Sequence, residues 1–262
     1  MKKFKAMKLL AILLTVAFIA GCSANQPAVS ESTDEKTNYI MGLDDTFAPM
    51  GFRDEKGELV GFDIDLANVI AEKLGVTIVF QPIDWSMKET ELNAGNIDFI
   101  WNGYTITDER KEKVVFTESY LENSQIIVVM ANSDVDSKVD LEGKNVAVQA
   151  ESSALDAINT EPDFVASVSE LIEFSTNNEA FMDLEAGRSE AIVVDEVLAR
   201  YYMKQKGQEN YKVLEEDFGD EEYAVGLRKD DTALLKKLNA AFNEMKEDGT
   251  YDEIYAKWFS GN

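Results

Sequence analysis

Histidine is absent from this sequence of 262 residues, and cysteine occurs once, at Cys22. Without histidine the chain has no Ser/His/Asp or Cys/His catalytic arrangement and no histidine-based metal site. A single cysteine leaves no disulfide within the chain. The side chains that most often carry nucleophilic or metal chemistry are therefore missing, and we predict no catalytic residue, no metal and no cofactor.

Basic residues are also scarce: 25 lysines and arginines stand against 50 aspartates and glutamates, a formal charge of −25. Leaving out residues 1–21, which hold four lysines and no acidic residue, makes the charge −29. We exclude nucleic acid as a partner, because phosphate binding needs an excess of Lys and Arg. The acidity is typical of a solvated, soluble exterior.

The longest apolar run lies near the N-terminus, where four lysines precede residues 9–19. This run is too short to span a bilayer, so residues 1–21 are predicted to be an export signal. The run ends in Ile19-Ala20-Gly21-Cys22, which resembles the bacterial lipoprotein box. That resemblance implies cleavage before Cys22 and a lipid on its thiol, which would hold the protein on the outer face of the cell membrane. An ordinary signal peptide with a stray cysteine is the alternative.

Residues 22–38 are polar and are predicted to be a flexible tether, since they have almost no large apolar side chain to bury. From Tyr39 on, short apolar runs alternate with amphipathic ones, which predicts an α/β fold. The first expected strand begins at residue 39. Further strands are expected at residues 76–80, 97–101, 125–130, 145–149, 171–174, 191–194 and 223–227. Expected helices run from an Asp63 cap to Gly75 and over residues 86–94, from Ser152 or Ser153, over 177–186 and 231–247, and around Trp258.

The segment after the third of these strands has the composition of a small-anion clamp. Arg110 offers a planar fork of donors that suits a carboxylate, and Thr105 and the Gly103 backbone can approach from the side. The alternative is that Arg110 pairs with Glu109 or Glu112 on a solvated turn.

Polar side chains follow the other expected strands in the same way. Ligands of open parallel sheets sit beyond the carboxyl ends of the strands, and those ends carry Asp44, Gln149 and Asp195 here. With hydroxyls at a helix N-terminus, these groups are complementary to a zwitterion. The predicted ligand-binding residues are Asp44, Phe47, Trp85, Asn102, Gly103, Tyr104, Thr105, Arg110, Gln149, Ser152, Ser153 and Asp195. Plain alternatives remain: Asp195, Ser152 and Ser153 as helix caps, and the aromatic residues as core, where we place Trp101.

Residues 92–100 and residues 184–192 have similar sequences, and each segment has the pattern of a helix end, a glycine and a buried strand. This indicates two similar lobes, although helix–glycine–strand is common enough to recur by chance.

Three motifs in order carry a resemblance over the chain beyond the tether: GFDIDL at 61–66, TITDER at 105–110 and DGTYDEIYAKWF at 248–259. They resemble the polar amino-acid-binding proteins of bacterial ABC importers, the extracellular solute-binding proteins of family 3. The resemblance implies a two-lobed, periplasmic-binding-protein-like (type II) fold with two hinge strands. Lobe 1 would be residues 39–121 and 223–262, and lobe 2 residues 122–222, with the crossings near Glu122 and Glu222.

The resemblance also implies roles. Arg110 would hold the ligand α-carboxylate, helped by Thr105 and the Gly103 and Ser153 backbones, and Asp195 would hold the α-ammonium. Side-chain selectivity would fall to Asp44, Phe47, Trp85, Asn102 and Gln149. Asn102 replaces a residue that is usually small, and Glu151 replaces a usual glycine. Asp44 favours a basic ligand side chain, whereas Asn102 and Gln149 suit an amide, so a basic amino acid and glutamine both stay open.

The resulting expectation is a monomeric, lipid-anchored receptor that captures a polar amino acid and presents it to a membrane permease. An enzyme on the same scaffold is one alternative, because carboxylates can act as general acids and bases without histidine. A ligand sensor that docks to a signalling receptor is the other.

Overall fold

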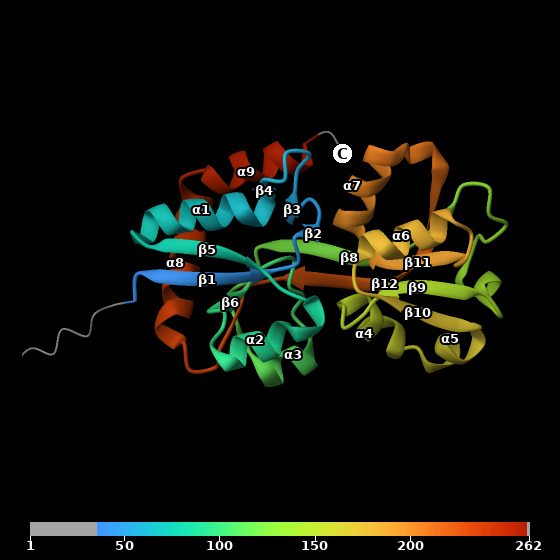
Figure 1. Ribbon diagram of the computed structural model, residues 1–262, viewed down its shortest axis with the longest axis horizontal. Helices are drawn as coiled ribbons and strands as arrows, with labels where there is room; N and C mark the ends of the chain where they lie inside the picture. The colour runs from blue at the N-terminus through green and yellow to red at the C-terminus, as the bar shows by residue number, and fades with distance from the viewer. Residues whose placement is uncertain (1–35, 261–262) are drawn as a thin grey trace, which may run out of the picture. The chain divides into compact units, whose positions relative to one another are not determined.

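The computed structural model describes residues 36–260. The predicted signal peptide, Cys22 and nearly all of the predicted tether lie outside these residues. The described chain forms a mixed α/β fold with two five-stranded sheets and one small sheet (Figure 1).

The first sheet has the order β5 (Thr77–Pro82), β1 (Asn38–Leu43), β6 (Phe99–Ile100), β13 (Gly226–Leu227) and β7 (Val115–Phe116). The second has the order β10 (Glu170–Phe174), β9 (Asn145–Gln149), β11 (Ala191–Asp195), β8 (Leu121–Met130) and β12 (Tyr211–Tyr223). The small sheet joins β2 (Thr46–Phe47), β3 (Gly51–Arg53) and β4 (Leu59–Val60). β1 pairs in parallel with β5 and β6, and β9 with β10 and β11.

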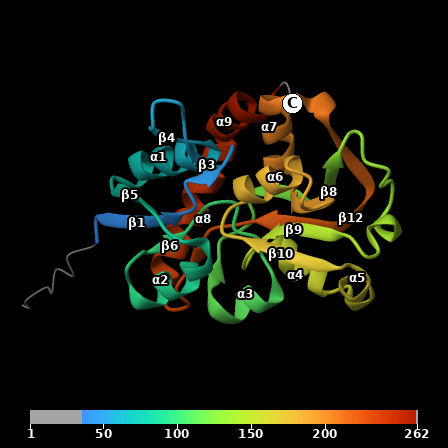
Figure 2. The same ribbon diagram turned by 45° about the vertical axis from the view of Figure 1, so that its right-hand side comes forward.

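Helices cover both faces of each large sheet (Figures 1 and 2). The helices of the first sheet are α1 (Phe62–Leu74), α2 (Lys88–Ala94), α3 (Asp108–Lys113), α8 (Thr232–Glu247) and α9 (Thr250–Phe259). Those of the second are α4 (Ser153–Asn159), α5 (Pro162–Ser167), α6 (Asn177–Glu185) and α7 (Glu196–Lys206). Three 3-10 turns lie at Trp85–Met87, Lys138–Leu141 and Gln208–Asn210. We call the first sheet with its helices lobe 1 and the second with its helices lobe 2.

The chain passes between the lobes twice, from β7 to β8 and from β12 to β13. β8 and β12 form a long antiparallel pair in which Glu122 lies opposite Glu222. The two connections run side by side, because the Tyr120 amide donates to Tyr223 O at 2.9 Å and the Thr117 amide to Val225 O at 3.0 Å. The pairing of β8 with β12 therefore extends up to lobe 1.

A continuous apolar core joins the lobes. Met41 and Phe99 of the first sheet and Val128 and Ile192 of the second belong to one cluster of buried side chains. Smaller clusters fill the space under α4 and α5 and under α2. Alternate residues of β11 belong to different clusters, so this strand is buried on both faces. Burial on both faces explains why it appears in the sequence as a short continuous apolar run.

Most expected elements are present, with shifted ends. β9 has the predicted bounds, and Gly75 ends α1 in the left-handed conformation as predicted. The predicted strand 223–227 is wrong, because β12 ends at Tyr223 and the chain changes sheets before β13 begins. The Asp63 cap is also wrong: Gly61 is the N-cap of α1, and Asp63 lies fully buried in its first turn.

Asp63 instead ties the helix to the loop after β6. Its Oδ2 accepts hydrogen bonds from the Gly103 amide at 2.8 Å and the Tyr120 hydroxyl at 3.0 Å. Burial raises the pKa of Asp63 to about 7, although both hydrogen bonds lower it. The folded protein therefore binds a proton at Asp63 more readily than the unfolded chain does, and this contribution to stability fades as the pH rises from about 4 to about 7.

We expect Asp63→Ala to lower the free energy of unfolding by several kcal/mol, since it leaves two buried donors without an acceptor at about 1–3 kcal/mol each. Asp63→Asn keeps an acceptor and should cost less. It should also flatten the dependence of stability on pH between about 4 and 7. Urea unfolding at pH 5 and pH 8 measures both effects, and an equal pH dependence in native and Asp63→Asn proteins would contradict the assignment.

Candidate functional site

The predicted site residues gather where the carboxyl ends of the parallel strands of both sheets meet. Asp44 directly follows β1, Asn102 follows β6, and Gln149 and Asp195 are the last residues of β9 and β11. All twelve predicted ligand-binding residues are buried. Trp101 is buried in the core, as predicted.

Hydrogen bonds cross between the lobes at this place, and the three shortest are these. Thr105 Oγ1 donates to Ser153 Oγ at 2.9 Å, and Gln149 Nε2 donates to Asp44 Oδ2 at 3.0 Å. The third, from Lys88 Nζ to the Glu151 carbonyl oxygen, measures 2.8 Å. The structure is therefore a closed form, in which the polar groups of the two lobes contact one another directly.

Arg110 is placed by the start of α3. Thr107 is the N-cap of this helix and accepts the Arg110 amide, which leaves the arginine side chain free to turn inward. The guanidinium lies over the Tyr104 ring, 4.7 Å from its centre, and donates to Thr105 O at 3.1 Å and to Glu151 O at 3.4 Å.

The alternative that Arg110 pairs with a glutamate on a solvated turn is wrong. Arg110 is 3 % exposed, and Glu109 pairs with Lys113 instead. Its ion pair with Asp156 spans 3.9 Å, so a buried positive charge faces mainly neutral carbonyl oxygens. Such a group suits an incoming carboxylate.

Asp195 is the counterpart in lobe 2. Its Oδ1 accepts hydrogen bonds from Asn123 Nδ2 at 2.9 Å, Gln125 Nε2 at 3.0 Å and the Tyr223 hydroxyl at 2.5 Å. Burial and, next, the charge of Glu221 raise its pKa well above the usual range. Asp195 is the N-cap residue of α7, as its plain alternative had it, but its side chain makes no capping hydrogen bond and is directed at Asn123, Gln125 and Tyr223 instead.

Asp44, Asn102 and Gln149 form a connected polar group beside these two charges. Asp44 Oδ1 accepts from the Thr46 amide and hydroxyl, and the Asp44 amide donates to Asn102 Oδ1 at 3.0 Å. Burial is the main cause that raises the pKa of Asp44. Asn102 Nδ2 has no hydrogen-bond partner among residues 36–260, so one buried donor stays available.

Two expected contacts have a different arrangement. The Gly103 amide, expected to face the ligand, is directed at Asp63. Ser152 is the N-cap of α4, as its plain alternative had it, and also donates to Gln149 O at 2.7 Å. Trp85 and Tyr104 pack edge to face, 5.9 Å apart.

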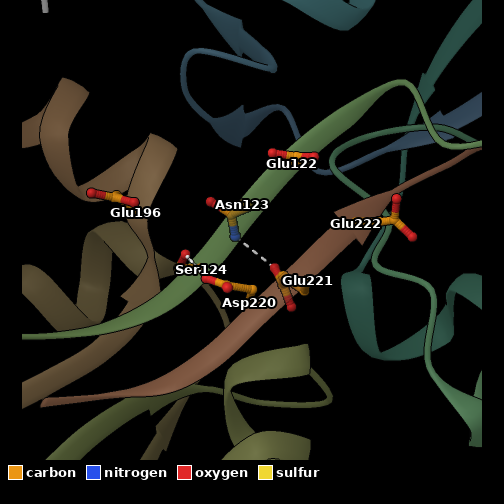
Figure 3. A pocket seen from close by; sticks show the side chains of 7 residues that line it. All are labelled: Glu122, Asn123, Ser124, Glu196, Asp220, Glu221 and Glu222. Atoms are coloured by element: carbon orange, nitrogen blue, oxygen red, sulfur yellow. Dashed lines mark hydrogen bonds between the residues drawn. The ribbon is translucent and has the colours of Figure 1, made fainter.

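Sequence reasoning missed several polar residues, most of them on the strands that connect the lobes. Four are buried and Glu221 is half-buried: Lys88, Asn123, Gln125, Glu221 and Tyr223. Asn123 and Gln125 lie on one face of β8, two residues apart, and Glu221 and Tyr223 share a face of β12 in the same way. The spacing of two residues could have indicated from the sequence that each pair shares a face of its strand. The register that brings the two pairs together could not be predicted in this way. Beside them lies a cavity of about 460 Å³ lined by Glu122, Asn123, Ser124, Glu196, Asp220, Glu221 and Glu222, shown in Figure 3.

None of the helices within residues 36–260 is long and apolar enough to cross a membrane. No group of three or more Cys, Asp or Glu side chains in this part of the chain is arranged to hold a metal ion.

A buried guanidinium and a buried carboxylate, presented by opposite lobes of an α/β fold, define a two-lobed ligand-binding protein. The family described as bacterial extracellular solute-binding proteins, family 3, matches residues 39–261. The L-cystine-binding protein TcyJ of Escherichia coli (strain K12) is 31% identical over 255 residues, which are 95% of this chain and 94% of the relative. The chain belongs to this family of solute-binding proteins.

Solved structures agree with this assignment. A substrate-binding protein of an ABC uptake transporter from Streptococcus pneumoniae, solved with bound histidine, is 42% identical with a TM-score of 0.84, over 86% of this chain and 93% of that one. An ancestral arginine-binding protein, solved with arginine and with glutamine, is 43% identical with a TM-score of 0.80, over 86% of this chain and 99% of that one.

Lys88 gives a prediction about closure. Its side chain is 2% exposed, and burial, followed by the Arg110 charge, lowers its pKa to about 8, whereas Glu89, 3.6 Å away, opposes the shift. Separating the lobes would return Lys88 to water, where a lysine pKa is about 10.4. Closure then releases a proton from Lys88, so the closed form gains stability as the pH rises above about 8.

We therefore expect small-angle X-ray scattering of the ligand-free protein to show a smaller radius of gyration at pH 9.5 than at pH 7. Lys88→Met should abolish this change, whereas Lys113→Met, at a more exposed lysine paired with Glu109, should keep it. A pH response that survives in Lys88→Met would rule Lys88 out as its origin.

Proposed function

We propose that this protein is the extracytoplasmic substrate-binding component of an amino-acid ABC transporter, which captures a free polar amino acid between its lobes and delivers it to the permease. One observation carries the proposal: Arg110 and Asp195 are both buried, lie on opposite lobes and do not pair with each other. Buried charges are costly without a partner, and a zwitterion supplies both partners at once.

The ligand would bind with its carboxylate at Arg110, next to Thr105 and Ser153, and with its ammonium at Asp195. Its side chain would meet Asp44, Asn102 and Gln149, between the rings of Phe47 and Trp85. Asp44 favours a cationic side chain, and the free Asn102 amide favours an acceptor, so basic amino acids and glutamine are the candidates. Relatives solved with histidine, arginine and glutamine support this class.

Closure would turn about the β8 and β12 connections, with lobe 1 as residues 39–121 and 223–262 and lobe 2 as residues 122–222. A ligand that contacts both lobes favours the closed form by its differential affinity, and the exclusion of water strengthens each ionic contact. The closed form is then the species that a permease distinguishes from the empty protein.

We further propose that the mature protein is a monomer attached to the outer face of the cell membrane through a lipid on Cys22. The lipoprotein box in the sequence supports this part of the proposal. No catalytic role is assigned, since the buried charges are explained by ligand binding, and turnover of a bound amino acid would instead indicate an enzyme.

The deciding experiment is a thermal-shift screen of the protein from residue 23 onward against all the common amino acids. A ligand that binds only the native state raises the melting temperature in proportion to its occupancy. We expect a clear shift with a basic amino acid or glutamine, and no shift with any amino acid would refute the proposal.

Arg110→Ala should weaken binding of that amino acid at least tenfold, because hydrogen bonds to charged groups contribute about 1.5–3 kcal/mol each. Titration calorimetry measures the affinity. Arg200→Ala serves as the control, since it removes an arginine that pairs with Glu196 on the surface of α7. Nearly equal affinities of native and Arg110→Ala proteins would show that Arg110 does not bind the ligand.

Cys22→Ser should leave the protein uncleaved or soluble, with unchanged ligand affinity, because only the lipid attachment site is lost. Membrane fractionation with immunoblotting distinguishes the forms. Recovery of a mature, fully membrane-attached Cys22→Ser protein would be incompatible with lipid anchoring at this residue.

A further inference from the structure

Glu221 lies against Asp195 through two shared amide groups. Asn123 Nδ2 is 2.9 Å from Asp195 Oδ1 and 2.6 Å from Glu221 Oε1. Gln125 Nε2 is 3.0 Å from the first oxygen and 2.9 Å from the second. An amide nitrogen carries two hydrogens, so each amide can donate to both carboxyl groups. The arrangement holds two acidic groups of lobe 2 close together between the same two donors.

The surroundings add negative charge to this pair. In Figure 3, Asn123 is directed at Glu221, and the cavity beside them is also lined by Glu122 of β8, Asp220 and Glu222 of β12, and Glu196 of α7. The three side chains that donate to Asp195 Oδ1 are uncharged, because the third is the Tyr223 hydroxyl.

The charged groups of the carboxylate end are directed elsewhere. Arg110 of α3 donates to Thr105 O and Glu151 O, and Asp156 of α4 pairs with Arg110. Two acidic groups that share a site cannot both ionise easily without a nearby cation. Consistent with this, burial and the Glu221 charge raise the pKa of Asp195.

We propose that Asp195 holds a proton beside Glu221 in the ligand-free protein, and that the ligand ammonium displaces this proton into solvent when it binds. This inference rests on the proposed binding of an amino acid at Asp195. It adds Glu221 to the ammonium subsite, as the residue that makes binding depend on pH.

The ammonium brings one positive charge, Asp195 becomes a carboxylate beside it, and the proton that Asp195 held leaves for the buffer. Affinity should therefore be constant at pH values where Asp195 is already ionised in the ligand-free protein, and should fall by up to tenfold per pH unit below that range.

Titration calorimetry at one pH in buffers with different ionisation enthalpies counts the protons released. The probes are L-arginine and L-glutamine, because neither has a side chain that titrates between pH 5 and 8. We expect the observed heat to vary with the buffer, corresponding to release of up to one proton per ligand. Buffer-independent heats for a saturable binding reaction would overturn the inference and leave the proposed function standing.

Glu221→Gln tests the assignment to this pair. We expect this variant to release less than half as many protons as the native protein and to show a weaker pH dependence of affinity between pH 5 and 7. Glu244→Gln is the control, since Glu244 lies on α8 outside this acidic cavity and pairs with Lys73, and its release should equal that of the native protein. Equal release in native and Glu221→Gln proteins would overturn the inference.

A third outcome concerns the proposed function. If no amino acid binds in calorimetry or in the thermal-shift screen, the ammonium subsite does not exist and both proposals fail. Binding without proton release and absence of binding are therefore separate results.

Discussion

Two buried ionisable groups that do not pair with each other dominate this structure. The Arg110 guanidinium and the Asp195 carboxyl group lie on opposite lobes, each almost completely removed from water. Burial of an unpaired charge is strongly unfavourable, so such an arrangement persists only where the surrounding fold compensates for it. Carbonyl oxygens compensate Arg110 in part, and neutral amides and a hydroxyl compensate Asp195. A zwitterionic ligand of suitable length would supply the missing charged partner to both groups.

The strands that connect the lobes also supply the polar side chains around Asp195. β8 supplies Asn123 and Gln125, and β12 supplies Glu221 and Tyr223, within the same antiparallel pair that the chain uses to leave and re-enter lobe 1. In the proposed closure, a rotation about this pair would change the distance between the lobes without moving these four side chains apart. The proposed ammonium end of the site would then be fixed to the connecting strands, whereas the proposed carboxylate end would be assembled by closure.

The sequence predicted the elements and the strand-end residues, because these depend on local patterns. Short continuous apolar runs located β9 and β11, and the parallel arrangement placed their last residues, Gln149 and Asp195, at one edge. The contacts of Asp63, Lys88 and Glu221 were not predictable, since each depends on a partner 40 or more residues away: Asp63 on Gly103, Lys88 on Glu151 and Glu221 on Asn123. Such contacts follow from register and from lobe packing, which no local pattern encodes.

Glu151 shows how local strain and the site are connected. It has a positive φ of 54°, a conformation that favours glycine and that an ordinary residue adopts only when the surroundings impose it. The surroundings here are two cations of lobe 1, because Lys88 and Arg110 both donate to the Glu151 carbonyl oxygen. The left-handed backbone turns that oxygen toward lobe 1 just before α4 begins. The contact between the lobes is made by the backbone carbonyl group of Glu151 and not by its side-chain carboxylate. This contact holds the left-handed backbone in place, so a residue other than glycine is tolerated here.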